Sequence, residues 1–184
     1  MKDTQREQVY FWQKIYIDMT DRQFLDLNSC QLIVNDMHQC FGIHKAPEVR
    51  ATHSKCKSWY HGSDYRINIK ETHRYRTVLA HEASHSIARY FYGYTIESHG
   101  PEFMGILMVL LNRWCKIPMA DLRRTTKWAA ADFKIDYDFY GMPAAPRTAL
   151  RNPLTNIRLA KRKSYANHAW CDTLPNGGYG VYYV

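Results

Sequence analysis

The chain has 184 residues, of which 46% are hydrophobic and 23% charged, and it carries a formal net charge of +8. This composition is typical of a folded domain and excludes a chain that is wholly disordered, collagen-like or coiled-coil. The longest apolar run, Phe103–Leu111, is far shorter than the roughly 20 residues of a membrane-spanning helix. With no apolar stretch behind the charged start of the chain, we expect a cytoplasmic, nucleoid-associated or nuclear protein, neither secreted nor bound to membrane. The five cysteines include no CxxC pair, so we expect reduced thiols rather than a cysteine zinc site.

The spacing of apolar side chains predicts two helices at the start of the chain. Residues 5–19 carry apolar side chains every three or four positions, as one face of a helix does. A second helix is expected to begin at Thr20, a typical N-cap residue, and its apolar stripe ends near Gly42. Each helix therefore offers one apolar face to a core.

Short strands are predicted next. Tyr65–Lys70 alternates apolar with polar residues, which is typical of a strand that is buried on one face. Its expected partners lie near Val49–His53 and near Lys57–Tyr60, and a further short strand is expected over Tyr179–Val184. The sheet is therefore small, and the predicted fold class is α+β.

Two central helices follow the predicted sheet. Helical spacing returns over Thr72–Tyr92, and Gly93 is a suitable C-terminal stop. The next helix is expected to have Pro101 at its first position and Glu102 near its positive end. Residues 101–115 are apolar on most sides, which predicts a helix in the core.

The last part of the chain changes in composition. A further helix is predicted over Pro118–Ala131, and beyond it no acidic residue occurs between Asp138 and Asp172. We therefore divide the chain into a domain of residues 1–140, containing the helices and the small sheet, and a basic C-terminal extension of residues 141–184.

The strongest chemical signal is the motif HExxH, formed by His81, Glu82 and His85 within a predicted helix. Imidazoles at positions i and i+4 project from the same face of a helix and can share one Zn²⁺. The glutamate beside the first histidine can take a proton from a water molecule at the metal. The motif therefore indicates a metal-dependent hydrolase, although two surface histidines with an incidental glutamate would give the same pattern.

A third ligand is required for a catalytic zinc site. A metzincin would continue with glycine and histidine at the positions of Ala88 and Phe91, which excludes that class. The downstream candidates are Glu97, His99 and Glu102. His99 is placed best, because it lies immediately before a helix start in a loop that can fold back on the metal.

The order of two motifs resembles a known family. The HExxH motif at residues 81–85, followed by the string HGPEF at residues 99–103, resembles the SprT-like metalloprotease domain, which also occurs in the eukaryotic protease Spartan. An alternating strand just before the HExxH helix, as in Tyr65–Lys70, belongs to the same pattern. The resemblance covers roughly residues 20–130.

The resemblance implies a zincin-like fold, with HExxH on the central active-site helix and a small sheet packed on helices. It implies one catalytic Zn²⁺ held by His81, His85 and His99, with Glu82 as the general base of a metalloendopeptidase. Zinc would polarise the scissile carbonyl and activate a water molecule. We expect Glu102 to support His99 or to cap its helix rather than to bind metal.

One residue role implied by the family stays open, and one part of the family pattern is missing here. A second donor to the tetrahedral intermediate is expected, and Tyr60, His61, Tyr75 and other polar residues nearby are candidates. Many SprT-like proteins carry a cysteine zinc ribbon near the C-terminus, whereas Cys171 stands alone here. In the place of that ribbon lies the basic segment.

The basic segment is the predicted contact with nucleic acid. Its cations are Arg147, Arg151, Arg158, Lys161, Arg162 and Lys163. Tyr165, His168 and Trp170 follow, and cations interleaved with aromatic rings can bind phosphates and stack on bases. Arg123 and Arg124 would extend a basic face, with Lys127 beside them, although a solvated basic surface would carry the same residues.

The leading hypothesis is thus a zinc endopeptidase that cleaves DNA-associated proteins, including proteins crosslinked to DNA, as the better-known relatives do. Its expected partners are a protein substrate and DNA, single-stranded DNA included. One alternative is a zinc-stabilised module that binds DNA or protein with little proteolysis, and the intact Glu82 argues against it. The other is a protease for a dedicated partner without DNA, whose cleavage would be indifferent to DNA and to charge reversal at Lys161–Lys163.

Overall fold

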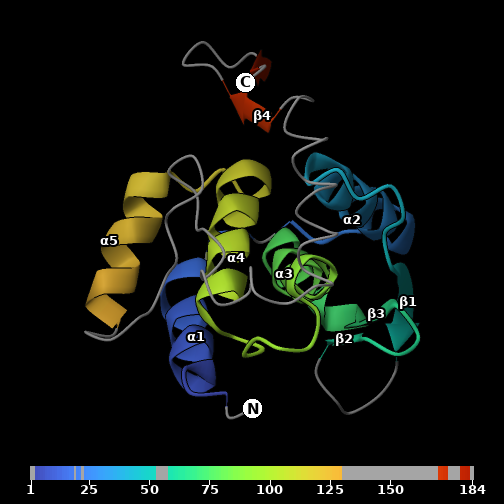
Figure 1. Cartoon of the computed structure of the whole chain (residues 1–184), viewed down its shortest axis with the longest axis horizontal. Coiled ribbons are helices and arrows are strands. Elements are labelled where there is room, and N and C mark those ends of the chain that lie inside the picture. The colour runs from blue at the N-terminus through green and yellow to red at the C-terminus, as the bar shows by residue number, and fades with distance from the viewer. Residues whose placement is uncertain are drawn as a thin grey trace.

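The computed structural model describes residues 3–18, 20–21, 23–52, 58–129, 170–173 and 179–182 (Figure 1). The described part is α+β, as the sequence predicts. In chain order its elements are α1 (Arg6–Trp12), the π-helical segment η1 (Gln13–Ile17), α2 (Leu27–Cys40), β1 (Glu48–Thr52), β2 (Trp59–His61), β3 (Arg66–Lys70), the 3₁₀ turn η2 (Glu71–His73), α3 (Arg76–Tyr92), α4 (Pro101–Trp114), α5 (Met119–Ala129), β4 (Trp170–Thr173) and β5 (Tyr179–Tyr182).

The first helix differs from the uniform α-helix that is predicted over residues 5–19. After Trp12 the helical turn widens, and the amide of Asp18 donates to the carbonyl of Gln13 at 2.9 Å, a bond between residues five apart. The wider turn changes which side chains face inward. Gln13 and Ile17 are buried, whereas Ile15, expected on the apolar face, is 49% exposed.

The start of α2 corrects the predicted N-cap. Thr20 does not begin the helix, because its hydroxyl donates to the carbonyl of Ile17 at 2.7 Å. The cap is Asp26, whose carboxylate accepts from the amide of Ser29 at 2.8 Å and so satisfies one of the free N–H groups of the first turn. The helix ends at Cys40, close to the predicted end.

The sheet of β1, β2 and β3 has the order β1-β3-β2, with β1 parallel and β2 antiparallel to β3. All three strands lie within a few residues of their predicted positions. The central strand is not buried on one face only, because Ile67, Asn68 and Ile69 are all buried. Consecutive side chains of a strand point to opposite faces, so the centre of β3 is covered on both faces and the strict alternation predicted for Tyr65–Lys70 fails at Asn68.

The core is built around α3 and α4. These helices pack against each other, and α3 also contacts α2 and β2 (Figure 1). Gly93 ends α3 with φ of +70°, a conformation that favours glycine, and Pro101 begins α4. Apart from its ends, α4 is almost wholly buried, as its apolar sequence predicts. The helix predicted over Pro118–Ala131 is α5.

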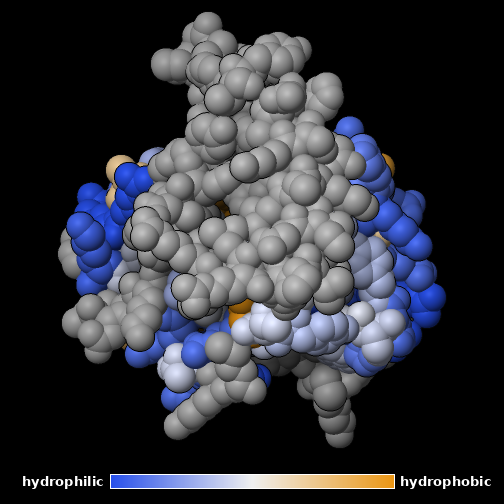
Figure 2. Space-filling model, in the orientation of Figure 1, coloured by the Kyte–Doolittle hydropathy of each residue, from blue (hydrophilic) through white to orange (hydrophobic). Residues whose placement is uncertain are grey.

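In the described part of the chain, the surface is more hydrophilic than the core. Most apolar side chains of α3 and α4 are buried, and on the face drawn in Figure 2 the coloured residues at the surface are mainly hydrophilic. Among the described residues, no helix combines the length and hydropathy needed to cross a bilayer.

In the predicted basic extension, β4 and β5 pair as an antiparallel ribbon, and the boundary at residues 140 and 141 lies outside the described residues.

Candidate metal centre

Two histidines of the HExxH motif face the same side of α3. They are one turn apart, and the Nε2 atoms of His81 and His85 lie 3.2 Å from each other. The helix is long and well covered, so that His81 is only 5% exposed. The helical placement that the sequence predicts for this pair is therefore confirmed.

The loop between α3 and α4 brings the third histidine to this pair. One potential ligand atom from each of His81, His85 and His99 lies within 4.8 Å of the others. Among the described residues, this is the group of three such side chains whose spacing suits a metal ion. The backbone turns sharply just before α4, where the amide of Gly100 donates to the carbonyl of Glu97 at 3.1 Å. The site thus combines one helix and one loop, and it can hold a metal ion.

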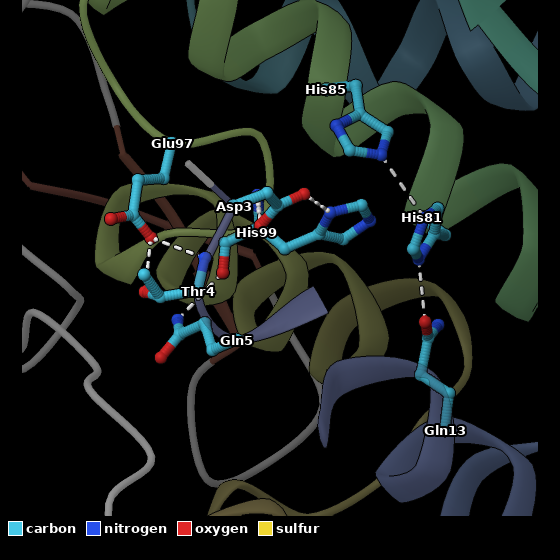
Figure 3. A network of polar contacts seen from close by, with 8 residues as sticks. All are labelled: Asp3, Thr4, Gln5, Gln13, His81, His85, Glu97 and His99. Atoms are coloured by element: carbon cyan, nitrogen blue, oxygen red, sulfur yellow. Dashed lines mark hydrogen bonds and ion pairs between the residues drawn. The ribbon is translucent and has the colours of Figure 1, made fainter. Parts of the chain in front are cut away.

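Hydrogen bonds determine which ring nitrogen His81 and His99 offer to a ligand. The Nδ1–H of His81 donates to Oε1 of Gln13 at 2.6 Å, and that of His99 donates to Oδ2 of Asp3 at 2.7 Å (Figure 3). Because these oxygens can only accept, the lone pair of each ring is on Nε2. Nε2 of His99 is buried and has no hydrogen-bond partner. This unpartnered nitrogen lies close to the Nε2 atoms of His81 and His85, an arrangement that fits a bound cation, so the residues present fit Zn²⁺.

Burial also keeps these rings in the neutral form that binds metals. Desolvation, together with a smaller effect of the nearby His99, lowers the pKa of His81 to about 3. The pKa of His85 is well below its usual value, again chiefly because of burial. Burial lowers the pKa of His99 too, although the carboxylate of Asp3 opposes the shift. At neutral pH all three imidazoles are therefore available as ligands.

Glu82 lies beside the histidines with little exposure to solvent. Burial raises its pKa to about 8, and a hydrogen bond from the backbone N–H of Tyr60 opposes that shift. A raised pKa makes the ionised carboxylate a stronger base, and a cation held by the three histidines would favour that ionised form. The position of Glu82 on α3 next to the metal ligands suits a general base.

Two aromatic rings enclose the cluster. The Phe103 ring of α4 is fully buried, and its centroid lies 4.4 Å from that of His85 and 4.9 Å from that of His99. On the outer side, Tyr10 stacks on His81 with ring centroids 5.3 Å apart. The aromatic part of the HGPEF string is thus the floor of the site, and α1 supplies a partial cover.

A cleft of about 370 Å³ opens beside Glu82, His85 and His99. One wall is the start of β2, with Trp59 and Tyr60. The remaining lining residues that can contact a ligand through polar or aromatic groups are Asp3, Arg6, Tyr10, Ser58, Arg89, Tyr94 and Ser98. A smaller hollow of about 130 Å³ lies near His81, and Tyr10, Ser58 and Glu82 line both spaces. The larger cleft therefore gives access to His85 and His99 from the side of β2.

Other predicted site residues have different outcomes. Glu102 is buried in the first turn of α4, where a carboxylate suits the positive helix end, and its support of His99 stays a prediction. Arg123, Arg124 and Lys127 are exposed on α5, as a basic face requires. The predicted nucleic-acid contacts lie outside the described residues: Arg147, Arg151, Arg158, Lys161, Arg162 and Lys163.

Sequence reasoning missed the contribution of residues 3–13. Asp3, Tyr10 and Gln13 all contact the metal-ligand rings, and none of them is in a recognisable motif. One signal was present: Gln5 and Gln13 lie on the same helical row as Val9, a buried apolar residue, and are themselves buried. Polar side chains on an inward face need buried partners, which these two find at the metal centre.

Comparison of this chain with family models, with curated proteins and with solved structures finds no match. What the site does must therefore be argued from its own residues and geometry.

Proposed function

We propose that this protein is a zinc-dependent endopeptidase of SprT-like type with a zincin-like active site. One observation carries the proposal: three imidazoles, of which those of His81 and His99 are buried, converge beside the glutamate of an HExxH motif, and the buried Nε2 of His99 lacks a partner. A helix with two incidental histidines would require neither the third histidine nor the carboxyl group at that position. The order of HExxH and HGPEF in the sequence supports the same conclusion.

The residues divide the chemistry between them. His81, His85 and His99 would hold the ion through Nε2, with Gln13 and Asp3 fixing the rings of the first and the last. A bound Zn²⁺ polarises the scissile carbonyl and favours deprotonation of water near neutral pH. Glu82 accepts the proton of the attacking water and then delivers it to the leaving amine.

The cleft supports a peptide as the substrate. Within the described sheet β2 is an outer strand, since it pairs with β3 on one side. Its residues Trp59 and Tyr60 line the cleft. An extended peptide that lies along this strand passes Glu82 and can add backbone hydrogen bonds to the sheet edge.

The second donor to the tetrahedral intermediate is proposed to be a tyrosine of this cleft. Of the three candidates named from the sequence, Tyr60 lines the cleft, and Tyr10 from α1 lines it as well. Burial raises the pKa of both phenols, so each keeps its proton and can donate a hydrogen bond at neutral pH.

DNA-associated proteins are the proposed substrates. The net charge of +8 favours a polyanionic partner, and Arg6 and Arg89 add cations along the cleft. A protease that binds DNA would find its substrates by shared occupancy of the same strand and would need little sequence specificity in the cleft.

The test is cleavage of a basic DNA-binding protein by the zinc-loaded chain, with and without single-stranded DNA. Glu82→Gln is the matched control, because it keeps the shape of the side chain and removes the base. We expect cleavage that requires Glu82 and is stimulated by DNA. Cleavage by Glu82→Gln at the wild-type rate would contradict the mechanism. Glu82-dependent cleavage that ignores DNA would instead indicate a protease for a dedicated partner.

A further inference from the structure

Residues 3–5 form a strap that holds the loop carrying His99. Gln5 donates from Nε2 to the carbonyl of His99 at 2.7 Å, and Thr4 donates from its amide and its hydroxyl to Oε2 of Glu97 at 3.2 and 2.7 Å. Asp3 accepts twice from His99, from the ring Nδ1 at 2.7 Å and from the backbone amide at 3.3 Å (Figure 3). Three groups of one histidine are therefore bonded by a segment more than 90 residues away in the sequence.

The strap matters because His99 differs from the other two ligands. His81 and His85 are placed by the regular backbone of α3, whose geometry is independent of the metal. His99 belongs to a loop, and a loop gains a fixed position only through contacts that oppose its conformational entropy. The contacts from residues 3–5 bond its backbone on both sides and also set the orientation of its ring.

We propose that Asp3 is a positioning residue of the metal centre, and that the strap of residues 3–5 and the metal ion bind to the chain cooperatively. The inference depends on the proposed function only in taking His99 as a ligand. Asp3 acts in two ways: its carboxylate keeps the proton on Nδ1, which leaves Nε2 free, and it increases the basicity of the ring toward a cation. Its second bond, from the amide of His99, couples ring and backbone.

The coupling has a consequence in the other direction. If a docked strap strengthens metal binding, a bound metal must strengthen docking of the strap by the same factor. Zinc should therefore protect the amides of residues 97–99, and that of Thr4, from hydrogen exchange in the wild-type chain. In Asp3→Ala the protection that zinc gives to these amides should be smaller.

The experiment measures zinc affinity by competition with a chelator in the absence of any substrate. Three variants of the full chain are compared: Asp3→Ala, Asp3→Asn, and Glu7→Ala as the control. Glu7 is an exposed carboxylate in the first turn of α1, so Glu7→Ala changes the charge of the region by the same amount. We expect Asp3→Ala to weaken zinc binding about 10- to 100-fold, as loss of a ring-orienting partner typically does. Asp3→Asn keeps a neutral acceptor and should fall between Asp3→Ala and wild type, whereas Glu7→Ala should match wild type.

Melting temperatures with and without zinc separate positioning from ordinary stabilisation. A positioning residue reduces the rise in melting temperature that zinc produces, whereas a merely structural one lowers both values equally. The proposal is overturned if Asp3→Ala binds zinc as tightly as wild type, if its loss equals that of Glu7→Ala, or if both melting temperatures fall in parallel. Affinity is measured without proteolysis, so the two proposals can fail separately. If zinc binding depends on Asp3 but the chain cleaves no protein, the proposed protease is contradicted and this inference is supported.

Discussion

The link between α2 and the HExxH helix depends on a histidine that has to remain neutral. His38 is fully buried in α2, where its Nδ1–H donates to the carbonyl of Val34 at 2.7 Å. Its Nε2 lies 3.0 Å from the hydroxyl of Ser86 on α3 and accepts from it. Protonation of the ring would turn this acceptor into a donor. We therefore predict that acidification weakens the packing of α2 on the active-site helix.

The size of the effect follows from the pKa of His38. Burial lowers that pKa from its ordinary value of 6.5 to about 4 in the folded chain. Between these values the unfolded chain binds a proton that the folded chain does not, so stability falls as the pH falls from 6.5 toward 4 and is fully present above 6.5. At about 1.4 kcal/mol for each pKa unit, His38 should cost about 2 kcal/mol of unfolding free energy between pH 7.5 and pH 5.

The assay is urea unfolding, followed by circular dichroism, over that pH range with a chelator present. His38→Gln is the comparison, because its amide can serve as both donor and acceptor and does not titrate. The histidines of the metal centre contribute equally to both proteins and cancel in the difference. Wild type should lose about 2 kcal/mol more than the variant between pH 7.5 and pH 5. Parallel loss in the two proteins would refute the argument.

Three further predictions concern the walls of the site. Phe103→Ala should cost about 3 to 5 kcal/mol of unfolding free energy and weaken zinc binding, because it removes the buried ring that packs under the histidines. The control is Phe11→Ala, at a ring that is 55% exposed, and it should have little effect in chemical denaturation. Gly93→Ala should cost about 1 to 3 kcal/mol through backbone strain alone, since φ is +70° and an added Cβ meets nothing within 4 Å. Tyr10→Phe and Tyr60→Phe are compared, and the variant that removes the second donor to the tetrahedral intermediate should lower kcat by about 10²- to 10³-fold with zinc affinity unchanged. An unchanged kcat in both variants would exclude both phenols as that donor.

The parts of the site that were predictable from the sequence are those with local periodicity. The i, i+4 spacing of His81 and His85 requires a helix and places both rings on one face. Pro101 at a helix start was equally visible, because proline lacks the N–H that the first turn leaves unpaired. These features depend on residues a few positions apart, and the structure agrees with them.

The misses arose where distant contacts override local pattern. The strap that fixes His99 joins residues 96 positions apart, and the bond from His81 to Gln13 spans 68. No spacing rule for helices or strands reports on such pairs. By residue type, Thr20 is a suitable N-cap for α2. In the structure Asp26 is the cap, because the residues that precede it contact α3 instead. Asp21 accepts there from the amide of Arg76 at 2.9 Å.

The central claim is an open zinc centre of three histidines, and X-ray absorption on the zinc-loaded chain tests it most directly. We predict one zinc per chain, bound by three imidazole nitrogens and one further light atom from solvent at about 2.0 to 2.1 Å. In His99→Ala one imidazole should be lost from the coordination shell. Sulfur in the shell, a fourth protein ligand that closes the site, or a shell unchanged in His99→Ala would contradict the account.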